Sequence, residues 1–351
     1  IDISNDNECA FRYACKNGHL HVAQWLLQIK PNINISNIDI DTFRYICENG
    51  HLHVMQWLYF IEPNIIIYND MNDPFIYTCK KGHLELAQWL LKVKPTINIS
   101  ADRDNAFKMA CAYEHLQVAQ WLLKVKPDIN VSAVNDYAFR LACENGYLLV
   151  AKWLIEEVNQ NINISSTNDH AFRFACYNEH LEVAQWLLSI NPRYKNSEHI
   201  DFLFRYACFY GQLQIAQWLL ELKPRINTYS TMESAFRFAC MNGYAELAEW
   251  LLEVKPNLNT GANMDFAFRF ACGNGHLQVA QWLWNIKPLI DIACDNHFAF
   301  RAACENEHLA VAQWLCDLNS PEYEIKVEDN KLKSWNIDKK VSYVSQYFYR
   351  N

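Results

Sequence analysis

A repeat of 32 residues constrains this chain more than any other feature. The segment AFRYACKNGHLHVAQWLL, residues 10–27, occurs with small changes in ten copies. Successive copies stand 32 residues apart, except for one interval of 33 between Trp153 and Trp186. Such a period is the signature of a solenoid, in which each unit packs only on its neighbours. The sequence therefore predicts one long array in place of separate globular domains. One tryptophan marks each copy: Trp25, Trp57, Trp89, Trp121, Trp153, Trp186, Trp218, Trp250, Trp282 and Trp314.

Each copy also carries one cysteine at the same helical position, from Cys15 to Cys304. Stacked helices lie about 8–10 Å apart, whereas the Cα atoms of a disulfide lie within about 7 Å. Equivalent cysteines therefore cannot easily pair, and we expect small buried thiols in a reducing, cytoplasmic compartment. Histidine follows the cysteine by four residues in seven copies, but Gly18 and its equivalents interrupt the helix between them. We expect a structural histidine and neither a metal nor a cofactor.

Composition narrows the choice of partners. The chain has 351 residues, of which 51% are hydrophobic, and a formal charge of −8. Binding to nucleic acid needs a basic surface, so this balance argues against such a partner. No apolar run approaches the ~20 residues of a membrane helix. No phosphate-binding loop, acid pair or nucleophile constellation stands out from the repeats, so we predict a protein without enzymatic activity that binds neither membrane nor small molecule.

Within a unit the spacing predicts two short helices. The first runs from about Ala10 to Asn17 and ends at Gly18, where a left-handed residue is needed. The second spans about Leu20 to Ile29 and is stopped by proline. An extended Ile-Asn-Ile-Ser segment leads to the next unit. Glutamate replaces the glycine at positions 114, 179 and 307, which indicates turns that are either strained or differently built. In the fifth unit, residues 157–160 replace Lys-Pro, and this extra residue accounts for the interval of 33.

A ladder of cations follows the first helices. An acid stands four residues before seven of the nine cations, a spacing that places both side chains on one helix face. The acids also precede the helix, where they could cap its amides. The alternative is that this row of cations binds polyanions. Cations that are neutralised by neighbouring acids attract polyanions only weakly, so we favour ion pairs with a structural role. The ladder comprises Arg12, Arg44, Lys108, Arg140, Arg173, Arg205, Arg237, Arg269 and Arg301. The tryptophans, set among leucines, are expected in the core.

The two ends depart from the repeat. Residues 1–4 (IDIS) match Ile33–Ser36 and lead us to expect an N-terminal side truncated within a longer array. Alternation around residues 323–335 predicts a β-hairpin, and residues 341–349 form a short helix or a strand. We therefore expect a solenoid of ten repeats over residues 1–318 and a capping segment over residues 319–351.

These units resemble the ankyrin repeat. NGHLHVAQWLL is similar to the family's NGHLEVVKLLL, and RYAC stands where that family has HLAA. The resemblance covers about residues 1–318, and AFR, AQWLL and IKPxINIS are similar to ankyrin proteins of large DNA viruses of amoebae. It implies an all-α ankyrin solenoid of helix-turn-helix units. The family's Thr-Pro-Leu-His is absent, because Phe11 and Arg12 stand at Leu-His, so its side-chain hydrogen bonds there cannot be carried over.

In ankyrin proteins, partners commonly touch the finger tips and the residues that end the first helix. At that position this chain has Tyr177, Phe209 and Met241 in three successive repeats, with Tyr210 beside Phe209. Flanking repeats carry charged or small residues there. An apolar strip with a polar rim indicates an interaction site, although neighbouring loops could cover it.

The expected function is a protein-binding scaffold that holds a protein partner on its concave surface and finger loops. An alternative is a structural component of a larger assembly such as a virus particle, with host cytoplasm or virion as its location. A targeting subunit for an enzyme domain encoded upstream is a third hypothesis.

Overall fold

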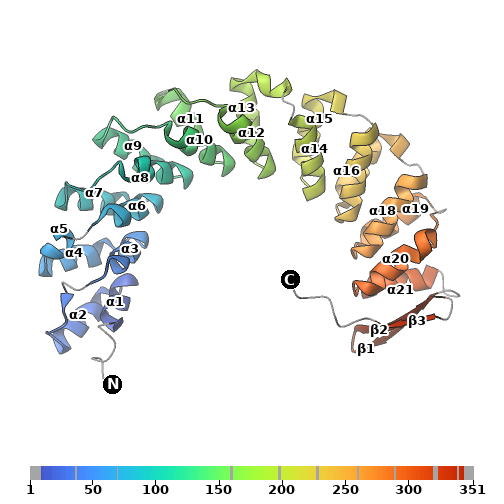
Figure 1. The fold of residues 1–351 in the computed structure, drawn as a ribbon, viewed down its shortest axis with the longest axis horizontal. Coiled ribbons are helices and arrows are strands. Elements are labelled where there is room, and N and C mark those ends of the chain that lie inside the picture. The colour runs from blue at the N-terminus through green and yellow to red at the C-terminus, as the bar shows by residue number, and fades with distance from the viewer. Residues whose placement is uncertain are drawn as a thin grey trace. The chain divides into compact units, whose positions relative to one another are not determined.

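A computed structural model describes most of the chain. It covers residues 9–35, 38–68, 70–158, 161–196, 199–226, 229–258, 261–287, 290–318, 323–337 and 340–343. The chain forms two compact units, residues 1–191 and 192–351, which are described separately (Figure 1). The predicted division at residue 318 stays a prediction.

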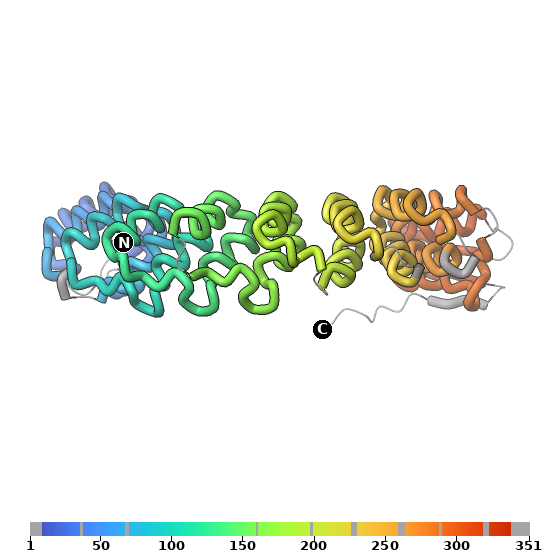
Figure 2. Tube along the Cα trace, turned by 90° about the horizontal axis from the view of Figure 1, so that it is seen from above, coloured from blue at the N-terminus to red at the C-terminus, as the bar shows by residue number. Residues whose placement is uncertain are grey.

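The described residues confirm the all-α repeat fold: apart from the short helix α5 (Asn64–Tyr68), helices α1–α21 form ten pairs. Within each unit the first helices of the pairs line one side and the second helices the other (Figures 1 and 2). The first helices are α1 (Cys9–Lys16), α3 (Ile40–Glu48), α6 (Asn72–Lys80), α8 (Ala101–Ala112), α10 (Ala133–Glu144), α12 (Ser166–Tyr177), α14 (Ile200–Tyr210), α16 (Tyr229–Met241), α18 (Gly261–Gly273) and α20 (Cys294–Glu305). The second helices are α2 (Leu20–Ile29), α4 (Leu52–Ile61), α7 (Leu84–Val93), α9 (Leu116–Val125), α11 (Leu148–Trp153), α13 (Leu181–Ile190), α15 (Leu213–Leu222), α17 (Ala245–Val254), α19 (Leu277–Ile286) and α21 (Leu309–Leu318).

The core is a column of phenylalanines, one from each first helix, and all of them are buried. A tryptophan from the next repeat covers most of these rings, as Trp121 covers Phe75 with ring centroids 6.3 Å apart. The prediction that the tryptophans belong to the core is only partly right. Trp153 is buried, but most others are half-buried and Trp25 is 54% exposed. These tryptophans therefore contact the core rings while remaining in part exposed to solvent.

The repeat cysteines are buried and carry free thiols, as predicted. Burial raises the pKa of Cys15 and of Cys47 to about 12, because a thiolate there would lose its hydration. These thiols therefore stay protonated and pack as small apolar groups.

Glycine ends the first helix with a positive φ in seven repeats, for example 84° at Gly243. In six of these repeats the histidine of the following repeat packs directly on the glycine, and Tyr244 takes this place against Gly211. A Cβ built on Gly243 would lie 2.5 Å from Nδ1 of His276. The bare glycine thus serves two needs, the left-handed backbone and room for the ring.

The same histidine ties two repeats together. His83 makes a ring-nitrogen hydrogen bond of 3.0 Å to the carbonyl of Glu48, at the end of the preceding first helix. In several other repeats an asparagine two residues before this position also donates to the equivalent carbonyl, as Asn274 Nδ2 does to Met241 at 2.8 Å. His276 also hydrogen-bonds the Met241 carbonyl. This Asn–His clamp gives the histidines a structural role.

The clamp makes stability depend on pH. Desolvation lowers the pKa of five of these histidines below the usual 6.5. The unfolded chain therefore binds protons at these histidines more tightly than the folded chain does. Their contribution to stability is fully present above pH 6.5 and is lost as the pH falls below it. We expect a melting temperature several degrees lower at about pH 5 than at about pH 7.5, as measured by calorimetry. A melting temperature that rose on acidification would contradict this. The five histidines with this lowered pKa are His51, His115, His180, His276 and His308.

The glutamates that replace the glycine keep the left-handed conformation, with φ of 67° at Glu114, 63° at Glu179 and 59° at Glu307. Of the two alternatives the structure therefore supports strained turns, since a side chain disfavours this region. Two of these glutamates precede repeats in which another residue replaces the histidine. Tyr147 stands there in the repeat after Glu114, and Gln212 in the repeat after Glu179.

The fifth second helix absorbs its extra residue by changing its winding. Helix α11 continues after Trp153 as a π-helix over Leu154–Val158. A π turn holds one more residue than an α turn. The interval of 33 is therefore accommodated within the helix.

The predicted pairing of each cation with the acid four residues before it is wrong for most members of the ladder. In α10, Val134, Asn135 and Asp136 have φ of 57–59°, so Asp136 lies outside the regular helix that carries Arg140. Arg140 Nε instead donates to the carbonyl of Asn135 at 2.7 Å. The predicted ion pair forms between Glu233 and Arg237, on the regular helix α16, and among the described residues it is the only one at this spacing. Arg173 and Arg301 repeat the carbonyl contact.

The C-terminal segment forms an antiparallel sheet of three strands, β1 (Tyr323–Glu328), β2 (Lys331–Ile337) and β3 (Lys340–Tyr343). The predicted hairpin is confirmed as β1–β2, and residues 340–343 are a strand. Residues 344–351 lie outside the described residues. Tyr323 stacks on Phe300, with centroids 4.1 Å apart and planes at 2°. The sheet therefore covers the last repeat as a following repeat would.

Candidate functional site

The first-helix face of residues 1–191 combines aromatic rings with cations. Arg44 lies over the rings of Tyr45 and Tyr77, at 5.3 and 5.5 Å. Lys80 lies over Tyr77 and over Tyr113 of the next repeat, at 5.6 and 4.9 Å. A cation held by a ring contributes to packing between repeats. This face therefore uses its charges within the fold.

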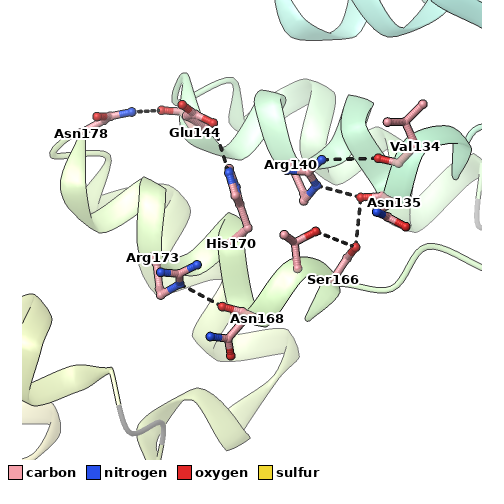
Figure 3. A network of polar contacts seen from close by, with 10 residues as sticks. Val134, Asn135, Arg140, Glu144, Ser166, Asn168, His170, Arg173 and Asn178 are labelled. Carbon is pink, nitrogen blue, oxygen red and sulfur yellow. Dashed lines mark hydrogen bonds and ion pairs between the residues drawn. The ribbon is translucent and has the colours of Figure 1, made fainter.

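Between α10 and α12 a network of polar contacts joins two repeats (Figure 3). Nε2 of His170 lies 3.8 Å from Glu144, and Asn178 donates to the Glu144 carbonyl at 2.8 Å. Desolvation, with the charges of Arg140 and Arg173, lowers the pKa of His170 to about 4. Desolvation also raises the pKa of Glu144. His170 is thus neutral at neutral pH and stacks on Phe174, 4.0 Å away. This arrangement suits packing between repeats.

In residues 192–351 an open groove lies between α14 and α16. It measures about 440 Å³, within the range of ligand pockets. Tyr206 and Tyr210, one turn apart on α14, have centroids separated by 4.4 Å. Phe209 meets Phe238 of α16 at 5.3 Å in an edge-on contact. This α14–α16 groove is lined by Phe202, Arg205, Tyr206, Phe209, Tyr210, Ser234 and Phe238.

Much of this aromatic surface meets solvent. Phe202 and Tyr210 are each 51% exposed, and Tyr206, Phe209 and Phe238 are half-buried. Burying an aromatic ring stabilises a complex by roughly 25 cal/mol per Å² of apolar area removed from water. The groove can therefore contribute substantially to the binding of an apolar group.

The four predicted site residues do not all belong to one site. Phe209 and Tyr210 line the groove. Met241, half-buried, ends α16 and is not among the lining residues. Tyr177, also half-buried, belongs to residues 1–191 and meets Phe174 at 5.2 Å. The structure places Phe209 and Tyr210 together, and the remaining two stay predictions.

Sequence reasoning missed Phe202, Tyr206 and Phe238. The aromatic residues at positions 202, 206 and 210 are spaced four residues apart and so form one stripe along a helix. Phe238 is the equivalent of Tyr206 in the next repeat. Both patterns are visible in the sequence. The prediction compared a single position across the repeats, the end of the first helix, whereas this stripe runs along α14.

In the part of the chain that the structure describes, no helix has the length and apolar character needed to cross a bilayer.

Comparison with known proteins agrees with the repeat. The sequence model of ankyrin repeats in sets of three matches residues 43–133, 139–231 and 236–329, and that of the single ankyrin repeat matches residues 6–38. A comparison with curated proteins found no matching sequence. Together with the ten helix pairs, these matches over most of its length show that the chain belongs to the ankyrin-repeat family.

Proposed function

We propose that this protein is a non-enzymatic scaffold that captures a partner protein on the first-helix face of residues 192–351, with the α14–α16 groove as the main anchor. Ankyrin repeats are generally protein–protein interaction modules. The observation that carries the proposal is the groove itself, where aromatic rings line an open cavity and two of them are half exposed. Exposed aromatic clusters of this kind supply the anchors of protein interfaces.

The groove is better suited to a protein segment than to a reaction. Arg205 is its only lining residue with a charged side chain. Acid–base or nucleophilic catalysis needs at least two groups in mutual reach, and this lining offers no such pair. Its shape, open along α14, suits a side chain presented by a partner.

The test is capture by the purified protein from an extract of its source cells, followed by mass spectrometry. We expect Phe202→Ser combined with Tyr210→Ser to reduce recovery of the specific partner at least tenfold, a loss of about 1.4 kcal/mol. Both residues are half exposed, so the variant is expected to keep its melting temperature.

Phe60→Ser is the matched control, because Phe60 is an aromatic residue of the second helix α4 and is 83% exposed. It should leave recovery unchanged. Equal loss with both variants would show that capture follows general surface hydrophobicity, and equal retention would refute the groove as the anchor.

The same capture separates the scaffold from a component of a larger assembly. A scaffold of the proposed kind is recovered with a different protein and remains monomeric in sedimentation at high concentration. Self-association that survives the groove variant would favour the assembly. We place the scaffold in the cytoplasm, because thirteen free cysteines suit a reducing compartment.

A further inference from the structure

We propose that the α14–α16 groove selects a partner segment in which an aromatic or branched apolar side chain stands beside a carboxylate, with Arg205 as the counter-ion of that carboxylate. The inference rests on the proposed function and specifies the chemistry of its partner. Two features of the groove support it: the lining is aromatic, and its only charged side chain is a cation.

Arg205 differs from the equivalent arginines of the next three repeats. Arg237 pairs with Glu233 on its own helix, and Arg269 pairs with Asp295 at 2.6 Å. Arg301 Nε donates to the carbonyl of Asn296 at 2.8 Å. Each of these guanidinium groups is used within the fold.

Arg205 is exposed, and within the described residues no hydrogen bond or ion pair engages its guanidinium. The acid four residues before it, Asp201, instead pairs with Lys223 at 3.0 Å. The Asp201 carboxylate is therefore occupied, and Arg205 remains available at the groove. A planar guanidinium beside an apolar pocket is suited to a carboxylate, which it can hold through two parallel hydrogen bonds.

The lining also argues against the opposite charge. Aromatic clusters can bind ammonium groups through their π faces. Here the carboxylate that usually completes such a cage is missing from the lining, and Arg205 would repel an incoming cation. An apolar group can fill the ring-lined space while the carboxylate stays at the partly solvated rim.

A phage-displayed library of random short peptides provides the probe. The library is selected on the intact chain, and peptides that also bind the Phe202→Ser, Tyr210→Ser variant are removed. We expect the remaining peptides to share an aromatic or branched apolar residue next to Asp or Glu. One such peptide and its amide twin, with Asp→Asn or Glu→Gln, are then synthesised, and their affinities are measured by fluorescence anisotropy.

We expect the amide twin to bind the native chain about tenfold more weakly than its parent. With Arg205→Ala the two peptides should bind alike, because the cation that distinguishes them is gone. Arg225→Ala, at an exposed arginine outside the groove, should keep the tenfold preference.

Three results would overturn the inference. Groove-dependent peptides without an acid, or with Lys or Arg in its place, would remove the charge preference and leave the scaffold proposal standing. A preference that persists in Arg205→Ala would assign it to another residue. A library without any groove-dependent peptide would also refute the inference, whereas the capture experiment decides the scaffold proposal separately.

Discussion

Replacing Gly243 with alanine is expected to destabilise the array by about 2–4 kcal/mol. Two costs combine. The left-handed backbone, with φ of 84°, disfavours any side chain. In addition, the new Cβ would lie 2.5 Å from Nδ1 of His276. The ring must then move and weaken its hydrogen bond to the Met241 carbonyl.

A double-mutant cycle separates the two costs. In a His276→Ala background the collision disappears, so Gly243→Ala should cost only the backbone share, about 1 kcal/mol. The readouts are the melting temperature and hydrogen exchange of α16 and α18, since local opening reports the stability of individual repeats. An equal cost in both backgrounds would show that the histidine does not need the bare glycine.

Glu114→Gly is the reverse of Gly243→Ala at an equivalent turn, and we expect it to change stability in the opposite direction. Glu114 has the same left-handed conformation, with φ of 67°, and Tyr147 follows in place of histidine. Glycine should therefore stabilise this turn, by about 1 kcal/mol. A loss of stability would mean that the Glu114 side chain makes contacts that outweigh its backbone strain.

The helices could be predicted because their signals are local. The second helix, Leu20–Ile29, agrees with its predicted bounds, since a glycine before it and a proline after it fix both ends. The clamp between repeats was not predicted, although the pairing of glycine with a later histidine was visible in the sequence. Recognising it requires knowing that residues 33 positions apart come into contact, as Gly18 and His51 do.

The predicted acid–cation ladder failed for a related reason. The spacing of Asp136 and Arg140 fits a helix face only if the helix is regular between them. Three consecutive left-handed residues, including the β-branched Val134, precede the regular part of α10. Such a turn is rare enough that no simple pattern predicts it. Where the helix is regular, at Glu233 and Arg237, the predicted pair forms.

The groove was predicted in part. Position within the repeat identified Phe209 and Tyr210, but Arg205 was assigned to the structural ladder. Its acid, Asp201, precedes it at the usual spacing, and only the structure shows that Lys223 occupies this carboxylate. The availability of a charge depends on contacts between elements, which a single helix does not reveal.

Replacing Phe300 with alanine is expected to cost about 3–5 kcal/mol and to release the C-terminal sheet. Phe300 is fully buried and meets Tyr323 of β1 and Trp335 of β2, with centroids 4.1 and 6.0 Å away. Polar contacts also hold Tyr323, whose hydroxyl lies 3.0 Å from Nδ1 of His297. The hydroxyl also donates to the carbonyl of Ile292 at 3.3 Å. Two such hydrogen bonds contribute about 2 kcal/mol, which is less than the expected cost of losing the ring.

The sheet should therefore lose its protection from hydrogen exchange together with α20 and α21. Phe236→Ala is the matched control, because Phe236 is equally buried and lies under Trp282, two repeats before Phe300. Since each repeat contacts mainly its neighbours, this variant should destabilise α16 and leave β1 and β2 protected. If the strands kept their protection in Phe300→Ala, the sheet would be stable by itself, and its stacking on the last repeat would contribute little to holding it.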